Sequence, residues 1–245
     1  MVNSILFSII GIIGFVALSD AQTQFESDTI PTDSGDLKLT FIGHGTLMFE
    51  FKGMVIHIDP VSQYADYAKM PKADIILVTH QHGDHLDPAA IKLIRKDDTA
   101  LIYTETCASQ MAGGTVLKNG DVTTVKGIKI EAVPAYNLVH KRDNGQPFHP
   151  KGMGNGYMLT LGDKRVYIAG DTENIPEMRN LANIDIAFLP MNLPYTMTPE
   201  MVAEAVRMFH PKILYPYHYG NTEVSKLIDL LKGEPNLDIR VRQLQ

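Results

Sequence analysis

The six residues from His80 to His85 constrain the fold of this chain more than any other feature. They hold three histidines and one aspartate in the order His-x-His-x-Asp-His. The preceding residues 74–79 (DIILVT) form a nearly continuous apolar run, which predicts a buried β-strand. Asp87 and Pro88 then fit the N-cap and the first position of a helix. The segment is therefore predicted to be a turn between a buried strand and a capped helix.

The residue types in this turn are those that bind divalent metal ions. Imidazole and carboxylate are the ligands that zinc and similar metals prefer. Alternation along an extended chain places His80 and His82 on the same side, so one ion can bind both. Asp84 and His85 follow Gly83, where the chain can bend, and could face a second ion. The alternative is a solvated His-rich loop, but the spacing and the strand–turn–helix context favour a two-metal centre.

The composition limits the ligands and the partners. Cys107 is the only cysteine, which excludes an intrachain disulfide and a Cys-rich zinc site. The net charge is −6 and there is no basic run, which argues against a nucleic-acid partner. Hydrophobic residues make up 44% of the 245 residues, enough for one sizeable domain. We therefore expect a metal held by His, Asp or Glu, and a small-molecule substrate.

The N-terminus differs from the rest of the chain. Residues 5–18 are almost continuously apolar and are followed by a small-x-small site that ends at Ala21. This pattern predicts a signal peptide over residues 1–21, because a membrane span needs roughly 20 apolar residues. The mature protein would be periplasmic or secreted, whereas a retained segment would associate it with a membrane. Residues 22–36 predict a polar tail, and residues 37–245 predict the folded domain.

Strand signals fill both halves of the chain, with helix signals spaced between them. This pattern predicts two mixed sheets packed together, with helices outside. The longest irregular stretch, residues 136–156, is of a length that usually marks a functional or disordered loop. Strands are expected at residues 38–42, 46–51, 54–58, 74–79, 100–103, 121–125, 128–133, 157–161, 165–169, 184–188 and 212–215. Helices are expected over residues 88–94, 198–210 and 222–232.

From about residue 37 to 240, the sequence resembles the metallo-β-lactamase superfamily, whose signature looks like His80-x-His82-x-Asp84-His85. The resemblance implies an α/β fold, the four-layer αββα sandwich. The branch that it resembles includes ascorbate-phosphate lactonase-like and N-acyl-phosphatidylethanolamine phospholipase D-like proteins. The segments that match this branch are Gly43-His44-Gly45, Ile58-Asp59-Pro60, Ala169-Gly170-Asp171-Thr172, residues 184–190 (IDIAFLP), Met197-Thr198-Pro199-Glu200 and Tyr217-His218-Tyr219.

By this resemblance, two distant residues complete the metal centre. Asp171 matches the carboxylate that bridges both metals, although a Gly-Asp pair is also common in turns. His218 matches the last histidine, which binds the second metal together with Asp84 and His85. A single histidine after a strand is more often structural, but the other matching segments favour a ligand.

One expected ligand is missing. The family usually supplies a third histidine to the first metal just after a strand, and here residues 133–137 (VPAYN) contain none. His149 and His140 are the candidates to replace it. His149 is favoured, because the glycines that follow could let its loop fold over the site. The alternative is a weaker first site with two histidines, completed by water, Asn137 or Tyr136.

The resemblance also implies a mechanism. Two divalent ions, zinc by default, with manganese and iron fitting the same ligands, would activate a water that attacks a carbonyl or phosphorus centre. Asp84 is expected to manage the proton, and Tyr136 or His44 to assist as a donor. His44 could also contact the substrate. Asp59 is expected to orient a ligand histidine through a hydrogen bond.

The sequence therefore predicts a metal-dependent hydrolase that uses a metal-activated hydroxide on a small lactone, ester or phosphoester. One alternative is a membrane-associated lipid phosphodiesterase, which a retained N-terminal segment would support. Another is a non-catalytic metal-binding protein, suggested by the missing histidine. β-Lactamase activity is disfavoured, because the matching segments resemble the other branch. Fold and metal chemistry alone do not choose among the substrates.

Overall fold

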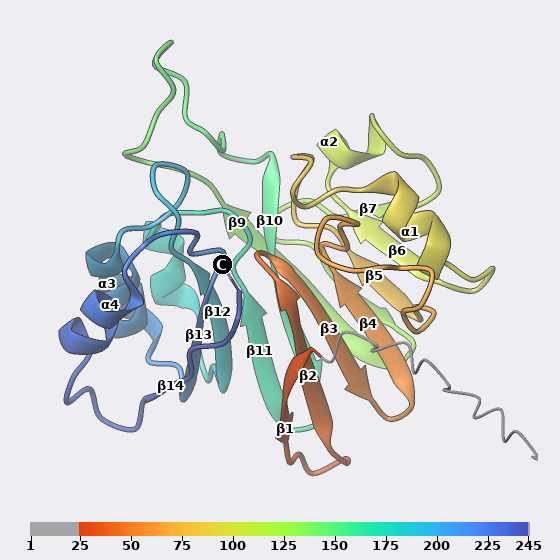
Figure 1. The fold of residues 1–245 in the computed structure, drawn as a ribbon, viewed down its shortest axis with the longest axis horizontal. Helices are drawn as coiled ribbons and strands as arrows, with labels where there is room; N and C mark the ends of the chain where they lie inside the picture. Colours follow the sequence, from red (N-terminus) through yellow and green to blue (C-terminus); the bar gives the residue numbers. More distant parts are fainter. Residues whose placement is uncertain (1–24, 245) are drawn as a thin grey trace, which may run out of the picture.

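Two seven-stranded β-sheets carry most of the chain in the computed structural model, which describes residues 25–244 (Figure 1). The first sheet has the order β1-β2-β3-β4-β5-β6-β7, antiparallel from β1 to β4 and parallel from β4 to β7. Its strands are β1 (Glu26–Ile30), β2 (Leu37–Gly43), β3 (Thr46–Phe51), β4 (Met54–Ile58), β5 (Ile75–Leu77), β6 (Ala100–Tyr103) and β7 (Thr115–Val116).

The second sheet comes from the C-terminal half, in the order β14-β13-β12-β11-β10-β9-β8. It is antiparallel from β8 to β11 and parallel from β11 to β14. Both sheets are therefore mixed, as predicted. The strands are β8 (Val122–Val125), β9 (Ile128–Ala135), β10 (Gly154–Leu161), β11 (Lys164–Ile168), β12 (Ile186–Pro190), β13 (Ile213–Tyr217) and β14 (Asp238–Ile239).

Helices cover the outer faces of the two sheets (Figure 1). α1 (Pro88–Ile94) and α2 (Glu105–Ala108) lie beside the first sheet, and α3 (Pro199–Phe209) and α4 (Val224–Leu230) beside the second. A short 3₁₀ helix, η1 (Pro176–Asn180), precedes β12. The carboxylate of Asp87 accepts hydrogen bonds from the backbone N–H groups of Ala89 and Ala90, which confirms the predicted helix start. The predicted four-layer sandwich is confirmed.

β5 shows why the run before the histidines is apolar throughout. Ile75 and Leu77 belong to the main core, where strands of both sheets pack together. Ile76 and Val78 belong to a second core that α1 covers with Ile91 and neighbouring residues. Every side chain of the strand is buried, so a strand with apolar residues on both faces replaces the usual alternation.

Strands from both sheets end at one edge of the sandwich, and polar residues follow them there. Asp59 follows β4, His80 comes shortly after β5, Asp171 after β11 and His218 directly after β13. β4 and β5 are parallel neighbours, and β11 and β13 are each parallel to β12, which lies between them, so the carboxyl ends point the same way within each sheet. Ligands in α/β sheets bind outside the carboxyl ends of strands. The fold thus brings distant parts of the sequence to one site.

The two sheets approach closely at this edge. The Tyr157 hydroxyl donates to the Val78 carbonyl oxygen at 2.8 Å, and the Asn155 N–H donates to the Thr79 carbonyl oxygen at 2.9 Å. Gly170 lies beside Asn155 and Thr79 and has a positive φ of 65°. A Cβ at this position would be 2.8 Å from the Asn155 carbonyl oxygen. Only glycine fits this backbone, which leads directly into Asp171.

The structure corrects the prediction for the N-terminal tail. Residues 26–30 form β1 and pair with β2 in antiparallel register, so a tail over residues 22–36 is wrong for this part. β1 is an edge strand with mostly exposed side chains, and its polar composition hid it. The predicted signal peptide, residues 1–21, lies outside the described residues. Among residues 25–244, no helix has the length and apolar character to cross a membrane.

Asp28 fastens β1 to the C-terminal end of the domain. Its carboxylate accepts hydrogen bonds from the Tyr215 hydroxyl at 2.5 Å, from Arg242 at 2.8 Å and from Arg240 at 3.1 Å. Burial raises the pKa of Asp28, but these three donors outweigh burial and lower it below its usual value. An ionised Asp28 therefore stabilises the folded state.

We predict that Asp28→Asn lowers the free energy of unfolding by about 2 kcal/mol at pH 7, because charged hydrogen bonds are lost. The lowered pKa of Asp28 gives stability that is present above its unfolded value, about 3.9, and is lost as the pH falls through the folded value. The difference from wild type should therefore shrink below about pH 4. Urea unfolding at pH 7 and pH 3 measures it. Asp36→Asn, at an exposed carboxylate, is the control, and an equal loss at both pH values would contradict the prediction.

Candidate metal centre

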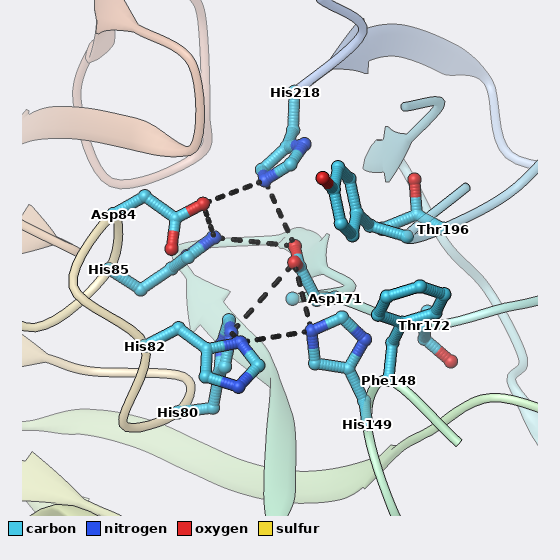
Figure 2. A network of polar contacts seen from close by, with 12 residues as sticks. His80, His82, Asp84, His85, Phe148, His149, Asp171, Thr172, Thr196 and His218 are labelled. Carbon is cyan, nitrogen blue, oxygen red and sulfur yellow. Dashed lines mark hydrogen bonds and ion pairs between the residues drawn. The ribbon is translucent and has the colours of Figure 1, made fainter. Parts of the chain in front are cut away.

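The residues predicted as metal ligands lie together at the strand ends (Figure 2). Figure 2 shows Asp171 between two groups of side chains. We call His80, His82 and His149 the first group, and Asp84, His85 and His218 the second group. In the first group, and in the second together with His44, the potential ligand atoms lie within 4.8 Å of one another.

The first group contains His149, the histidine predicted to replace the missing ligand. His82 Nδ1 lies 3.0 Å from His80 Nε2 and 3.2 Å from His149 Nε2. Asp171 Oδ2 lies 3.2 Å from His149 Nε2 and 3.8 Å from His80 Nε2. Three imidazoles and one carboxylate oxygen therefore converge, which is the ligand set that zinc and related metals prefer.

The second group faces the other oxygen of Asp171. Oδ1 lies 3.3 Å from His85 Nε2 and 3.5 Å from His218 Nε2. Asp84 Oδ2 lies 3.6 Å from His218 Nε2 and 3.4 Å from His44 Nε2. His44, expected as a donor or a substrate contact, thus also qualifies as a fourth ligand of this group. Asp171 thus presents one carboxylate oxygen to each group.

Buried polar atoms without hydrogen bonds support a metal at this site. Among the described residues, His85 Nε2, Asp171 Oδ1 and both ring nitrogens of His218 are buried and have no hydrogen-bond partner. Buried polar groups are normally hydrogen-bonded, so unsatisfied ones need an explanation. Among these atoms, His85 Nε2 and His218 Nε2 each lie within 3.5 Å of Asp171 Oδ1, and a cation between the three would satisfy them. The residues therefore fit divalent metal ions.

The pKa values of these groups are consistent with that fit. Burial and the nearby His85 lower the pKa of His80 well below its usual value. Burial raises the pKa of Asp171, but His218 and His85 outweigh it and hold the pKa well below the usual range. Burial lowers the pKa of His85, yet Asp171 and Asp59 raise it to about 10. The carboxylates that favour a proton on His85 would equally favour a metal cation beside it.

Asp59 holds His85 in place, as predicted for an orienting residue. It is fully buried, and its Oδ2 lies 2.7 Å from His85 Nδ1. The same carboxylate accepts hydrogen bonds from the backbone N–H and the hydroxyl of Thr79. Because Nδ1 faces Asp59, His85 presents Nε2 to the second group. Such hydrogen bonds orient metal-binding histidines and fix their tautomer.

Three residues of the site have left-handed backbone conformations. The φ angles of His44, Asp59 and His218 are 54°, 45° and 47°. The His218 N–H donates to the His44 carbonyl oxygen at 3.1 Å, so two of these residues hold each other. Non-glycine residues rarely adopt this region, and such strain concentrates at functional sites.

The loop between β9 and β10 explains how His149 reaches the first group. Asn137, which lies in the segment where the resemblance implies a histidine, accepts the backbone N–H of His149 at 2.8 Å. Its Oδ1 also lies 2.7 Å from His149 Nδ1, which directs Nε2 towards His82 and Asp171. Asn137 therefore orients the replacement ligand rather than serving as a ligand itself.

Glu173, which the sequence analysis missed, holds the base of this loop. Its buried carboxylate accepts the backbone N–H groups of Leu138, Val139 and His140, each at 2.7 Å, and the amide of Asn137 at 3.1 Å. Burial raises the pKa of Glu173, but the backbone donors outweigh it and lower the pKa. The sequence held one signal for Glu173, its position two residues after the predicted ligand Asp171, which places it close to the site.

Two of the predicted candidates lie elsewhere. The Tyr136 hydroxyl donates to Glu177 Oε2 at 2.9 Å, with Lys151 at 3.3 Å, and contacts neither group. The prediction of Tyr136 as a proton donor is therefore wrong, because its hydroxyl is engaged outside the centre. His140 Nδ1 lies 2.7 Å from Glu173 Oε1, so the alternative of His140 as the third histidine is also wrong.

A cavity of about 230 Å³ adjoins both groups. Six of its lining residues belong to the centre, and Arg142, Phe148, Asn192 and Tyr195 line it from two loops. Asp84 has a side chain that is 43% exposed, whereas Asp171 is 4% exposed. Asp84 is thus the carboxylate of the centre that a substrate or water can reach.

Several known proteins are similar to this chain in sequence and in fold. Residues 38–218 match the family described as "Beta-lactamase superfamily domain". A UPF0173 metal-dependent hydrolase of Pelotomaculum thermopropionicum is 31% identical over 196 residues, covering 75% of this chain and 85% of the relative. The crystal structure of a proposed metal-dependent hydrolase from Parabacteroides distasonis is 54% identical, with a TM-score of 0.86, covering 91% of this chain and 100% of that one.

A more distant structure has the same fold. Igni18, a metallo hydrolase from Ignicoccus hospitalis, is 24% identical, with a TM-score of 0.69. The match covers 85% of this chain and 95% of that chain. At this identity the similarity concerns the fold alone.

We predict that His149→Ala weakens the binding of one metal ion by more than about 100-fold. Loss of a residue that only orients a ligand costs roughly 10–100-fold, and here a direct ligand is removed. His140→Ala is the matched control from the same loop, and it should keep wild-type metal content. Isothermal titration with Zn²⁺ and elemental analysis of the purified proteins measure both. Wild-type affinity in His149→Ala would show that another group completes the first site.

We predict that Asp59→Asn weakens binding at the second group by about 10–100-fold, because His85 loses the carboxylate that orients it. The same Zn²⁺ titration measures the change, and circular dichroism checks that the variant folds. Asp74→Asn is the control, since Asp74 is a strand-flanking carboxylate that bonds Val55 and Lys96 away from the centre. Equal affinities in both variants would exclude an orienting role for Asp59.

Proposed function

This chain belongs to the metallo-β-lactamase superfamily and to its UPF0173 metal-dependent hydrolase family, and on that premise we propose that it hydrolyses a small lactone, ester or phosphoester. That it is a metal-dependent hydrolase follows from the family. The observation that carries the substrate proposal is the position of Asp171, whose two oxygens face separate ligand groups beside one cavity. This arrangement suits hydrolysis at a single carbonyl or phosphorus centre.

Divalent metal ions supply an activated water and a Lewis acid when bound. His80, His82, His149 and Asp171 would hold one ion. The other ion would be held by Asp84, His85, His218 and Asp171, with His44 as a further potential ligand. We propose zinc first, because imidazole and carboxylate suit it, while manganese and iron suit the same ligands.

Asp84 is the residue we propose for moving the proton. Burial raises the pKa of Asp84, but His218 and His44 outweigh it and hold the pKa well below the usual range. The carboxylate is therefore ionised, and its exposure lets it pass a proton to solvent. Asn192 lines the same cavity, and its side-chain amide makes no hydrogen bond with the described residues. That amide could donate to an oxygen of the substrate.

The size of the cavity supports a small substrate, since drug-sized ligands occupy roughly 300–1,000 Å³. The segments around His44, Asp59 and Asp171 that resemble the ascorbate-phosphate lactonase-like branch favour a lactone or phosphoester within this range. The alternative of a non-catalytic metal-binding protein was based on the missing third histidine. It is no longer supported, because His149 places a third imidazole in the first group.

The site of action belongs to the proposal as well. The apolar residues 5–18 and the small-x-small site ending at Ala21 support export to the periplasm or the medium. Mass spectrometry of the protein recovered from its native host measures whether the chain begins after Ala21. A retained segment would favour the alternative, a lipid phosphodiesterase at the membrane.

We predict that metal-loaded protein hydrolyses at least one class in a panel of lactones, esters and phosphoesters, and that ampicillin is not a substrate. Chelation should abolish the activity, and Zn²⁺, Mn²⁺ or Fe²⁺ should restore it. Asp171→Asn should lower kcat/KM by more than roughly 100-fold, because both groups lose their shared carboxylate. His140→Ala is again the control. No turnover of any class by protein that carries two metal equivalents would refute the proposal.

A further inference from the structure

One cationic side chain lines the cavity without taking part in the metal centre. Arg142 lies on the loop between β9 and β10, which projects from the sheet edge as the green arm in Figure 1. It shares the cavity with His44, Asp84 and Asp171, all of which belong to the centre. A substrate at the metal centre would therefore lie within the same cavity as this guanidinium.

The charge of Arg142 is not paired within the described part of the chain. Within residues 25–244, no Asp or Glu forms an ion pair with it, although the chain carries an excess of acidic residues. Its guanidinium makes one hydrogen bond, a long one of 3.4 Å from NH2 to the Phe148 carbonyl oxygen. Most of its five N–H donors are thus available to a ligand.

The local structure fixes the backbone at Arg142. The Arg142 N–H donates to the Gln146 carbonyl oxygen at 2.8 Å, and the Gly145 N–H donates to the Arg142 carbonyl oxygen at 2.8 Å, which closes a tight turn. A β-bridge between Lys141 and Pro147 lies directly below this turn. The backbone of Arg142 therefore has a defined position on the arm, from which its exposed side chain lines the cavity.

Aromatic rings support the guanidinium on the cavity side. Its Cζ lies 5.0 Å from the centre of the Phe148 ring, a distance typical of cation–π contact. Phe148 in turn packs edge-to-face on Tyr195, with ring centres 5.1 Å apart. Figure 2 shows Phe148 beside His149, so this wall adjoins the first group.

We propose that Arg142 forms a subsite for an anionic group, a carboxylate or a phosphate, that the substrate carries apart from the bond to be hydrolysed. The inference rests on the proposed function and narrows its substrate to anionic lactones, esters or phosphoesters. A planar guanidinium with free donors binds such groups through paired hydrogen bonds. The reaction itself stays at the metal centre, and Arg142 sets specificity.

The test compares substrates that differ in one charge. Kinetics of p-nitrophenyl esters of matched length, ending in a methyl, a carboxylate or a phosphate, are measured for wild type and variants. In Arg142→Ala, kcat/KM for the anionic esters should fall about 10- to 100-fold, mainly through KM, and stay within about 3-fold for the neutral ester. Arg142→Lys should lie between, because it keeps the charge but not the fork. The more affected ending distinguishes a carboxylate subsite from a phosphate subsite.

Lys141→Ala is the matched control, because it removes the same charge from the neighbouring residue, which does not line the cavity. Calorimetric titration of metal-loaded protein with glutarate adds a readout that needs no turnover. Equal losses for neutral and anionic esters in Arg142→Ala, or no preference for anionic esters in wild type, would overturn the subsite while leaving the proposed function intact. Glutarate binding that depends on Arg142, without hydrolysis of any lactone, ester or phosphoester by protein that carries two metal equivalents, would support the subsite and refute the proposed function.

Discussion

The carboxylate of Asp171 is the charge around which the site is organised. It is almost fully buried, and burial of an ionised group is expensive unless opposite charges face it. Its Oδ2 faces His149 and His80, and its Oδ1 faces His85 and His218. These imidazoles come from segments far apart in the chain, so the carboxylate can be accommodated only in the complete fold. The same concentration of charge leaves nitrogen and oxygen atoms without hydrogen bonds, and divalent cations are the species that would satisfy them.

Two further buried carboxylates hold the ligands at fixed positions. Asp59 contacts His85 directly, whereas Glu173 acts through Asn137, which orients His149. Each carboxylate also accepts backbone N–H groups, so it joins a ligand to the rigid main chain around it. Orientation by such partners matters nearly as much for metal affinity as the ligands themselves. The left-handed backbones at Asp59 and His218 belong to the same design, because a regular strand end would aim these side chains elsewhere.

The sequence was informative where local pattern and chemistry coincide. The apolar run of β5, the cap at Asp87 and the ligand spacing from His80 to His85 each depend on neighbours in the chain, and all three were found at the predicted places. The role of Asn137 could not be predicted, since it depends on a loop that returns to the strand end. Glu173 was missed for the same reason. β1 escaped detection because an edge strand needs few apolar residues, and its anchor, Asp28, pairs with arginines at the opposite end of the chain.

The displacement of the third histidine has a consequence for recognition. In this chain the third imidazole of the first group, that of His149, comes from the loop between β9 and β10, whereas the resemblance implies a histidine at the end of β9. Arg142 belongs to that same loop and contacts Phe148, the residue before His149. The same loop therefore places His149 in the first group and the guanidinium beside the cavity. If Arg142 binds an anionic group as proposed, one segment supplies both a ligand of the first group and the residue that recognises the substrate.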